Sequence, residues 1–248
     1  MPGSRLLGAA RRAFPAFEEE PLGGWSLRHD PDLPNRRVNA CWAIGGGSAD
    51  HLDEVVRWYA ERDRRPIVLT EPGSPVDEAL SGWEVQATTD VMTASLSPAE
   101  PSLLEPVAEW STAWAGLRGV TDPHRAALVD RLERVEAIGA VVRRHTTPVA
   151  AGLGVRDGDL VGIFNVATSP ADRRRGHATR ITRSLMAWGA AHGATTAYLQ
   201  VETANPGAAA LYHALGFTTA CRYHYRIGWG NGSSQGDPHS ATGVAASP

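Results

Sequence analysis

R-R-R-G-H-A-T, residues 173–179, lies between an apolar run at 160–167 and a helix-patterned segment that begins near Ala178. The first N–H groups of a helix have no partner within it, so a basic loop that opens into a helix directs several amides at one point. Gly176 has no Cβ, and the main chain can therefore approach an anion closely. The stretch predicts a seat for phosphate or pyrophosphate. Taken alone, the three arginines also fit a solvated run of charge.

The overall charge restricts the classes of partner. The 248 residues carry a formal net charge of −3, although arginine pairs or triplets recur along the chain. A general nucleic-acid binder needs a basic excess, so we expect no nucleic-acid partner. No stretch approaches the roughly 18 apolar residues that cross a membrane, so we expect no membrane partner either.

The two cysteines, Cys41 and Cys221, lie far apart and have no neighbours at metal-ligand or redox-motif spacing. This pattern predicts neither a disulfide framework nor a metal site, and it suits a reducing cytoplasm. The oligomeric state stays open between a monomer and a homodimer.

The N-terminal segment, residues 1–14, predicts an amphipathic helix. Leu6, Leu7, Ala10 and Phe14 share one face of it. A transit peptide is the alternative, whereas the segment is too short and too interrupted by arginine for a secretory signal.

Helices and strands alternate in both halves of the chain. The first half predicts strands at 24–28, 38–44, 67–69 and 85–94, with helices at 52–62 and 76–80. The second half predicts two helices within 110–142, then strand 160–167, helix 178–192, strand 195–202, helix 207–215 and strand 218–227. Residues 75–93 can be laid on 206–226 with Gly82-Trp83 matching Gly216-Phe217, so one supersecondary unit is expected twice.

Three segments follow from these patterns. A proline-rich stretch at 97–106 reads as a linker, so we expect one domain at 1–100 and a second at 101–227. Residues 228–248 are rich in Gly, Ser and Ala without periodicity, which predicts a disordered tail. The G-x-S-x-G at 232–236 has no strand before it and no helix after it, so we interpret it as a chance match.

Three signatures in the second half resemble the GNAT superfamily of N-acetyltransferases. They are R-x-x-G-x-A at Arg173, Gly176 and Ala178, a strand that leads to Asn205, and A-x-L-Y-x-x-L-G-F at 209–217. The whole chain, with G-G-W-S-L-R at 23–28 and R-V-N-A-C-W at 37–42, is similar to a two-lobed GNAT group whose acceptor is generally unassigned.

This resemblance implies an α/β fold with a mixed sheet, built as a tandem GNAT fold with a degenerate N-terminal lobe. The first lobe lacks R-x-x-G-x-G/A, and Asp50 would repel a pyrophosphate there, so we expect the lobe to complete the acceptor groove or the core. The C-terminal lobe would bind acetyl-CoA where two parallel strands splay apart, without a metal. The implied cofactor-binding residues are Val166, Ala167, Thr168, Arg173, Arg174, Arg175, Gly176, His177, Ala178, Thr179 and Asn205.

The residues in this region have ordinary structural explanations as well. Asn205 suits the N-cap of the next helix, and His177 suits a surface position. Tyr212 suits the edge of the core. Ile181, Leu185 and Trp188 have core spacing. Along the strand at 195–202, Ala197, Leu199 and Val201 share one face, whereas Tyr198, Gln200 and Glu202 share the other and would line the acceptor pocket.

The resemblance implies direct attack of an amine on the thioester, with Tyr212 as the general acid. Some superfamily members carry a glutamate early in the strand before the pyrophosphate loop, where this chain has Gly162. Glu202 is our candidate base, with an arginine ion pair as its alternative role and a water chain as another route. Asp157 and Asp159 suit turn positions better.

Two other classes of function stay open. An acyl-CoA-binding regulatory module without turnover would fit the missing strand carboxylate, and Tyr212 argues against it. A factor that binds nucleic acid or protein through its arginines would show steep salt dependence. The leading reading is an amine N-acetyltransferase whose acceptor is a protein or a small molecule.

Overall fold

The computed structural model describes residues 3–43 and 47–228 of the chain. The predicted disorder of residues 229–248, the G-x-S-x-G at 232–236 and the turn at Gly45-Gly46 lie outside these ranges. Within the described ranges, the helices are too short or too polar to cross a bilayer.

The described residues form two compact units. We call residues 3–15 and 90–221 the C-terminal unit, and residues 16–43, 47–89 and 222–228 the N-terminal unit. Strand β5 (Glu84–Ser95) begins in the N-terminal unit and ends in the C-terminal unit. Strand β11 (Thr218–Ile227) begins in the C-terminal unit and ends in the N-terminal unit. These bounds differ from the expected segments 1–100 and 101–227. The tandem-lobe arrangement stays a prediction.

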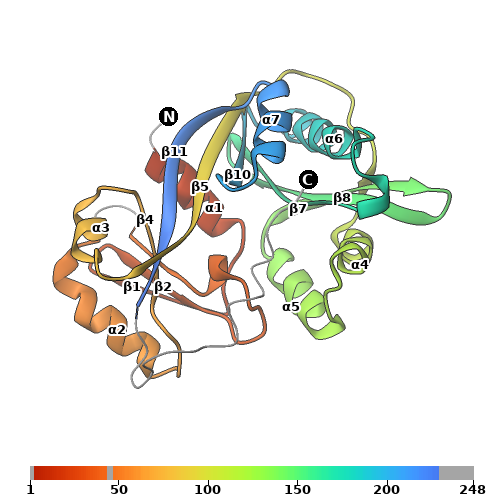
Figure 1. Cartoon of the computed structure of the whole chain (residues 1–248). Coiled ribbons are helices and arrows are strands. Elements are labelled where there is room, and N and C mark those ends of the chain that lie inside the picture. Colours follow the sequence, from red (N-terminus) through yellow and green to blue (C-terminus); the bar gives the residue numbers. More distant parts are fainter. Residues whose placement is uncertain (1–2, 44–46, 229–248) are drawn as a thin grey trace. The chain divides into compact units, whose positions relative to one another are not determined.

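The C-terminal unit contains a mixed sheet, as predicted. Its strands follow the order β5-β10-β9-β8-β7-β6 (Figure 1). The bounds are β6 Leu104–Glu105, β7 Glu136–Arg144, β8 Thr147–Asp157, β9 Leu160–Thr168 and β10 Thr196–Glu202. Strand β10 is parallel to β9, whereas the successive pairs from β6 to β9 are antiparallel.

Helices cover both faces of this sheet. They are α4 Val107–Arg118, α5 Asp122–Leu132, α6 His177–Ala191 and α7 Pro206–Ala214, and a 3-10 turn, η3, spans Pro170–Asp172. A Cβ on Gly139 of β7 would lie 2.1 Å from Trp110 of α4, and one on Gly152 of β8 would lie 2.4 Å from Ile181 of α6. Gly139 pairs with Leu153, the neighbour of Gly152, so α4 and α6 lie on opposite faces.

The core under α6 confirms the helix and strand periodicities. Ile181, Leu185 and Trp188 pack with the apolar face of β10 that was predicted from its alternation. The members of that face are Ala197, Leu199 and Val201. Burying these side chains stabilises the position of β10 beside β9.

The N-terminal helix also forms as predicted. Helix α1 (Gly3–Arg12) buries Leu6, Leu7 and Ala10, and Phe14 is buried just beyond it. The helix contacts β9, and two of its arginines form ion pairs: Arg5 with Asp159 and Arg12 with Asp157.

Two strands were missed in the C-terminal unit. The predicted helix pattern at 110–142 is wrong beyond residue 135, because 136–144 forms β7, and 147–157 forms β8. Gly139 permits the close approach to Trp110, and β-branched Val141 and Val142 favour an extended backbone. The expected linker at 97–106 contributes β6 to the same sheet edge.

The N-terminal unit has the strand order β1-β2-β3-β4-β11. Its elements are β1 Glu18–Leu22, β2 Trp25–His29, η1 Arg36–Val38, β3 Cys41–Trp42, η2 Ala49–His51, α2 Leu52–Ala60, β4 Ile67–Thr70 and α3 Pro75–Ala79. The predicted strand at 38–44 forms only as the two residues of β3, after η1. Strand β1 was missed because E-E-E-P-L is charged and contains proline, which suits an edge strand.

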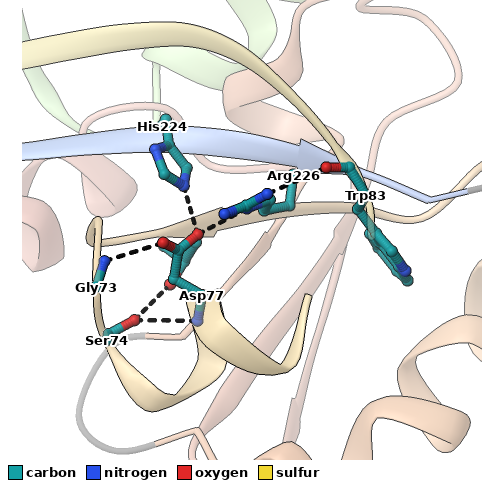
Figure 2. Close-up of polar contacts among 7 residues, drawn as sticks. Gly73, Ser74, Asp77, Trp83, His224 and Arg226 are labelled. Carbon is teal, nitrogen blue, oxygen red and sulfur yellow. Dashed lines mark hydrogen bonds and ion pairs between the residues drawn. The ribbon is translucent and has the colours of Figure 1, made fainter. Parts of the chain in front are cut away.

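A buried carboxylate ties α3 to the last strand of the N-terminal unit (Figure 2). Asp77 is 6% exposed, and its Oδ1 lies 2.6 Å from both His224 Nε2 and Arg226 Nε of β11. Its Oδ2 accepts a hydrogen bond from the Gly73 N–H at 2.9 Å. Burial raises the pKa of Asp77, but the hydrogen bonds from Arg226, Gly73 and His224 outweigh burial and hold the pKa well below its ordinary value.

We expect Asp77→Asn to destabilise the protein by about 3 kcal/mol at pH 7, because it leaves the largely buried guanidinium of Arg226 without its carboxylate. A depressed pKa stabilises the fold above the ordinary value near 3.9 and ceases to do so as the pH falls below it. The difference between wild type and variant should therefore shrink between about pH 5 and pH 2. Urea unfolding at several pH values measures it. The control is Asp53→Asn on the exposed side of α2, and an Asp77→Asn effect no larger than the control's would contradict the prediction.

Candidate active site

Strands β9 and β10 begin as a parallel pair and then separate. Their register runs from Leu160↔Thr196 to Ile163↔Leu199, and both strands continue beyond it, to Thr168 and Glu202. Peptide groups of β9 past Ile163 therefore face a gap in the ladder on the β10 side. An extended, amide-bearing molecule can pair with such an edge as an added strand would.

A bulge in β9 coincides with this separation. On its other side, β9 pairs Phe164 with Leu153 and Ala167 with Ala151, so two residues of β9 oppose Gly152. One of the two is Asn165, whose φ of 52° is left-handed. Bulges bend the bulged strand and redirect its side chains. Sequence analysis missed this residue, although asparagine inside an apolar run is the residue type that tolerates such a backbone.

The loop between β9 and α6 has the geometry expected of an anion seat. Gly176 has a φ of 75°, and a Cβ built on it would meet nothing within 4 Å. Arg174 also has a positive φ, of 63°. Helix α6 begins at His177 without a side-chain cap, so the N–H groups of its first turn have no partner within the helix. Consecutive amides in such a turn make a concavity that attracts anions.

The arginines of the loop lie at the protein surface. Arg173, Arg174 and Arg175 are exposed. Arg118, at the end of α4, is close enough to Arg173 for their charges to interact. Burial lowers the pKa of the Arg118 guanidinium, and the charge of Arg173 lowers it further. Sequence analysis missed Arg118 because its place beside the loop depends on the packing of α4. The local excess of positive charge favours a multiply charged anion.

Two buried polar atoms without hydrogen-bond partners in the described part of the chain indicate where a polar ligand such as acetyl-CoA would fit. Thr168 Oγ1, at the end of β9, and His177 Nδ1, at the start of α6, are buried without a hydrogen-bond partner among the described residues. Buried polar atoms normally have partners, so these two suit a polar ligand between the end of β9 and the loop. Val166 and Ala167 are buried beside Thr168. His177 is half-buried, which corrects its expected surface position.

Tyr212 is a buried side chain of α7. It is 8% exposed, and its ring packs edge to face on Phe217 with the centroids 5.9 Å apart. Burial raises its pKa to about 12. The phenol is therefore protonated at neutral pH and can donate a hydrogen bond.

Asn205 caps α7, which is the structural role expected for it. Its side chain accepts a hydrogen bond from the Ala208 N–H at 3.1 Å. Asparagine is among the preferred N-cap residues because its oxygen satisfies one of the first amides of the helix.

The candidate base has less support from the surroundings. Glu202 is half-buried at the end of β10. Tyr198, expected beside it on a pocket-lining face, is instead fully buried against Phe164, with ring centroids 5.7 Å apart. A Cβ on Gly162 would lie 2.4 Å from Phe164 and 2.7 Å from Tyr198, so these rings fill the space where some superfamily members carry a carboxylate. Asp157 and Asp159 are held by arginines of α1.

Metal ligands do not gather in the part of the chain that the structure describes. No group of three or more His, Cys, Asp or Glu side chains there is placed to hold an ion.

Comparisons with known proteins agree with this geometry. A "Probable histone acetyltransferase Rv0428c" of Mycobacterium tuberculosis is 27% identical over 233 residues, which cover 89% of this chain and 74% of that protein. A GCN5-related N-acetyltransferase from Kribbella flavida superposes with a TM-score of 0.68 at 16% identity, over 92% of this chain and 95% of the other. One from Sphaerobacter thermophilus gives 0.55 at 19% identity, over 86% and 84%.

The family described as "Probable histone acetyltransferase Rv0428c C-terminal" matches residues 5–226. This span includes the splayed strands, the arginine loop and α7. The chain therefore belongs to that acetyltransferase family, and its fold is similar to that of solved GCN5-related N-acetyltransferases.

Proposed function

We propose that the protein transfers the acetyl group of acetyl-CoA to a primary amine, without a covalent enzyme intermediate. The observation that carries the proposal is the coincidence of two features in the C-terminal unit. The β9–β10 ladder ends at Ile163, and left-handed Gly176 opens α6 a few residues after β9 ends. A thioester on an amide-bearing arm with a diphosphate at its far end matches both features.

Different residues of the C-terminal unit would bind different parts of acetyl-CoA. Peptide groups at Val166, Ala167 and Thr168 would pair with the amide-bearing arm, and the Asn205 amide would lie near the thioester. The main-chain amides and side chains of residues 173–179 would hold the diphosphate. When bound, acetyl-CoA supplies an activated carbonyl carrying the acetyl group.

Tyr212 holds the proton that the departing sulfur needs. A thiol has an ordinary pKa near 8.5, so complete transfer from a phenol at about 12 is uphill by roughly 5 kcal/mol. A donated hydrogen bond is available without that cost and strengthens as negative charge grows on its acceptor. Tyr212 therefore acts mainly by hydrogen bonding early in the departure, with proton transfer late.

The attacking amine must lose a proton, and Glu202 is the proposed acceptor. It stands at the open end of β10, beyond the last pair with β9. A chain of water molecules is the alternative, because Phe164 and Tyr198 exclude a carboxylate from the Gly162 position.

The N-terminal unit is proposed to bind no cosubstrate of its own. In this unit the first turn of α2 follows η2, where Ser48 Oγ donates a hydrogen bond to Asp50 Oδ2 at 2.7 Å. Asp50 and Asp53 place negative charge at a helix start, which repels a diphosphate.

A non-catalytic acyl-CoA-binding module is the second candidate. The aromatic side chains around Gly162 favour it, since they leave β9 without a base. Tyr212 favours the enzyme, because its buried phenol stays protonated and can serve as the general acid.

Release of free CoA from acetyl-CoA separates the two candidates. The acceptor panel should include small amines, amino acids and lysine peptides, the last because the Mycobacterium tuberculosis relative is named for histones. We expect amine-dependent release with at least one acceptor, and acetylated product by mass spectrometry. Tight binding of acetyl-CoA without release under every acceptor would support the module instead.

A further inference from the structure

A buried carboxylate, that of Asp172, lies immediately before the arginine loop. This residue ends η3 and is 2% exposed. Its own N–H donates to the Ser169 carbonyl at 2.9 Å, which fixes the turn. A carboxylate this buried is retained only where cations satisfy it.

Two arginines from separate elements meet on one oxygen of this carboxylate. Arg144 Nη1, from the end of β7, lies 2.9 Å from Asp172 Oδ1, and Arg175 Nη1, from the loop, lies 3.5 Å from the same atom. Both arginine side chains are more than half exposed, at 58% and 59%. Each guanidinium has five N–H donors in a plane, so donors remain on the solvent side of both.

Several further arginines lie in or near the same loop. Arg173 and Arg174 belong to this loop, and Arg118 lies near it: burial lowers the pKa of Arg118, and repulsion by the charge of Arg173 lowers it further. Asp172 itself pairs with Arg144 and Arg175. A further anion would relieve this repulsion, and paired planar guanidiniums suit a phosphate group best.

We propose that Arg144 and Arg175, aligned by Asp172, form a side-chain seat for a phosphomonoester, namely the 3′-phosphate that distinguishes CoA from 3′-dephospho-CoA. The proposal rests on the proposed function, since it concerns the same cosubstrate. Asp172 is a positioning residue here: it touches no ligand and holds two guanidiniums in register. The seat would make the protein selective for the phosphorylated nucleotide over the same thioester carrier without it.

Calorimetric titration of the whole protein with CoA and with 3′-dephospho-CoA tests this. We expect wild type to bind CoA about tenfold more tightly, as expected for charge-assisted contacts to a partly exposed site. Arg144→Ala should weaken CoA binding and leave 3′-dephospho-CoA binding unchanged, so that the ratio of the two dissociation constants approaches one. The matched control is Arg143→Ala, which removes the same charge from the adjacent residue, where Arg143 pairs with Glu105.

Asp172→Asn separates alignment from net charge. Removing the carboxylate makes the loop more positive, so simple attraction predicts tighter CoA binding. Loss of alignment instead predicts a smaller preference for CoA over 3′-dephospho-CoA. Equal affinities of wild type for both nucleotides, an unchanged ratio in Arg144→Ala, or tighter CoA binding by a folded Asp172→Asn protein would overturn the proposal while leaving the main-chain seat intact. If wild type binds neither nucleotide, the proposed function fails together with it.

Discussion

Gly176→Glu is expected to abolish binding of acetyl-CoA, with a loss of affinity of about a hundredfold or more. The new carboxylate would stand at the start of α6, among the amides that the diphosphate needs, and like charges placed together cost several kcal/mol. The Cβ itself has room, since nothing lies within 4 Å of it. Charge in the seat, and not a steric clash within the protein, is therefore the expected cause. Calorimetry and the shift of melting temperature by acetyl-CoA both measure the loss.

Backbone strain needs a separate control, because Gly176 has a φ of 75°. Gly193 has a φ of 87° and equally open surroundings, beyond the other end of α6. Gly193→Glu therefore introduces the same side chain and a similar strain away from the loop. It should lower the melting temperature comparably and leave acetyl-CoA affinity unchanged. A folded Gly176→Glu protein with wild-type affinity would refute the anion seat.

Local patterns made much of this region predictable. The proposed anion seat needs only contiguous residues: a strand, a turn with Gly176, and a helix with apolar spacing at Ile181, Leu185 and Trp188. The alternation in β10 likewise gave its core face correctly, and Asn205 behaves as the cap that its position indicated. Such features depend on periods of 2 and 3.6 residues and on capping, which neighbours in the chain determine.

Features that depend on tertiary packing were not predictable in the same way. Strands β7 and β8 are rich in Ala and Gly, and their identity as strands follows from the helices that press on Gly139 and Gly152. Arg118 and Arg144 reach the loop only because α4 and β7 fold beside it. The polar face of β10 was expected to line a pocket, but Tyr198 packs instead against Phe164, whose ring also contacts Phe14.

Tyr212→Phe is expected to lower kcat by about a hundredfold, within the usual range for a lost general acid, and to leave acetyl-CoA affinity nearly unchanged. Removing the hydroxyl leaves the buried ring in place, so the free energy of unfolding should change little. The ring keeps its contact with Phe217. A fall in kcat without a fall in stability therefore distinguishes a catalytic hydroxyl from a structural one.

The pH dependence sharpens this experiment. With a pKa of about 12, Tyr212 stays protonated at every pH at which the enzyme would be assayed, so its ionisation should not reduce wild-type kcat between about pH 7 and pH 9. A limb of the profile in that range belongs to the amine or to its base. Tyr198→Phe, at a fully buried tyrosine of the same unit, is the matched control and should keep kcat near the wild-type value. If Tyr212→Phe also keeps it, the proton reaches the sulfur from another donor, and Tyr212 is a core residue of α7.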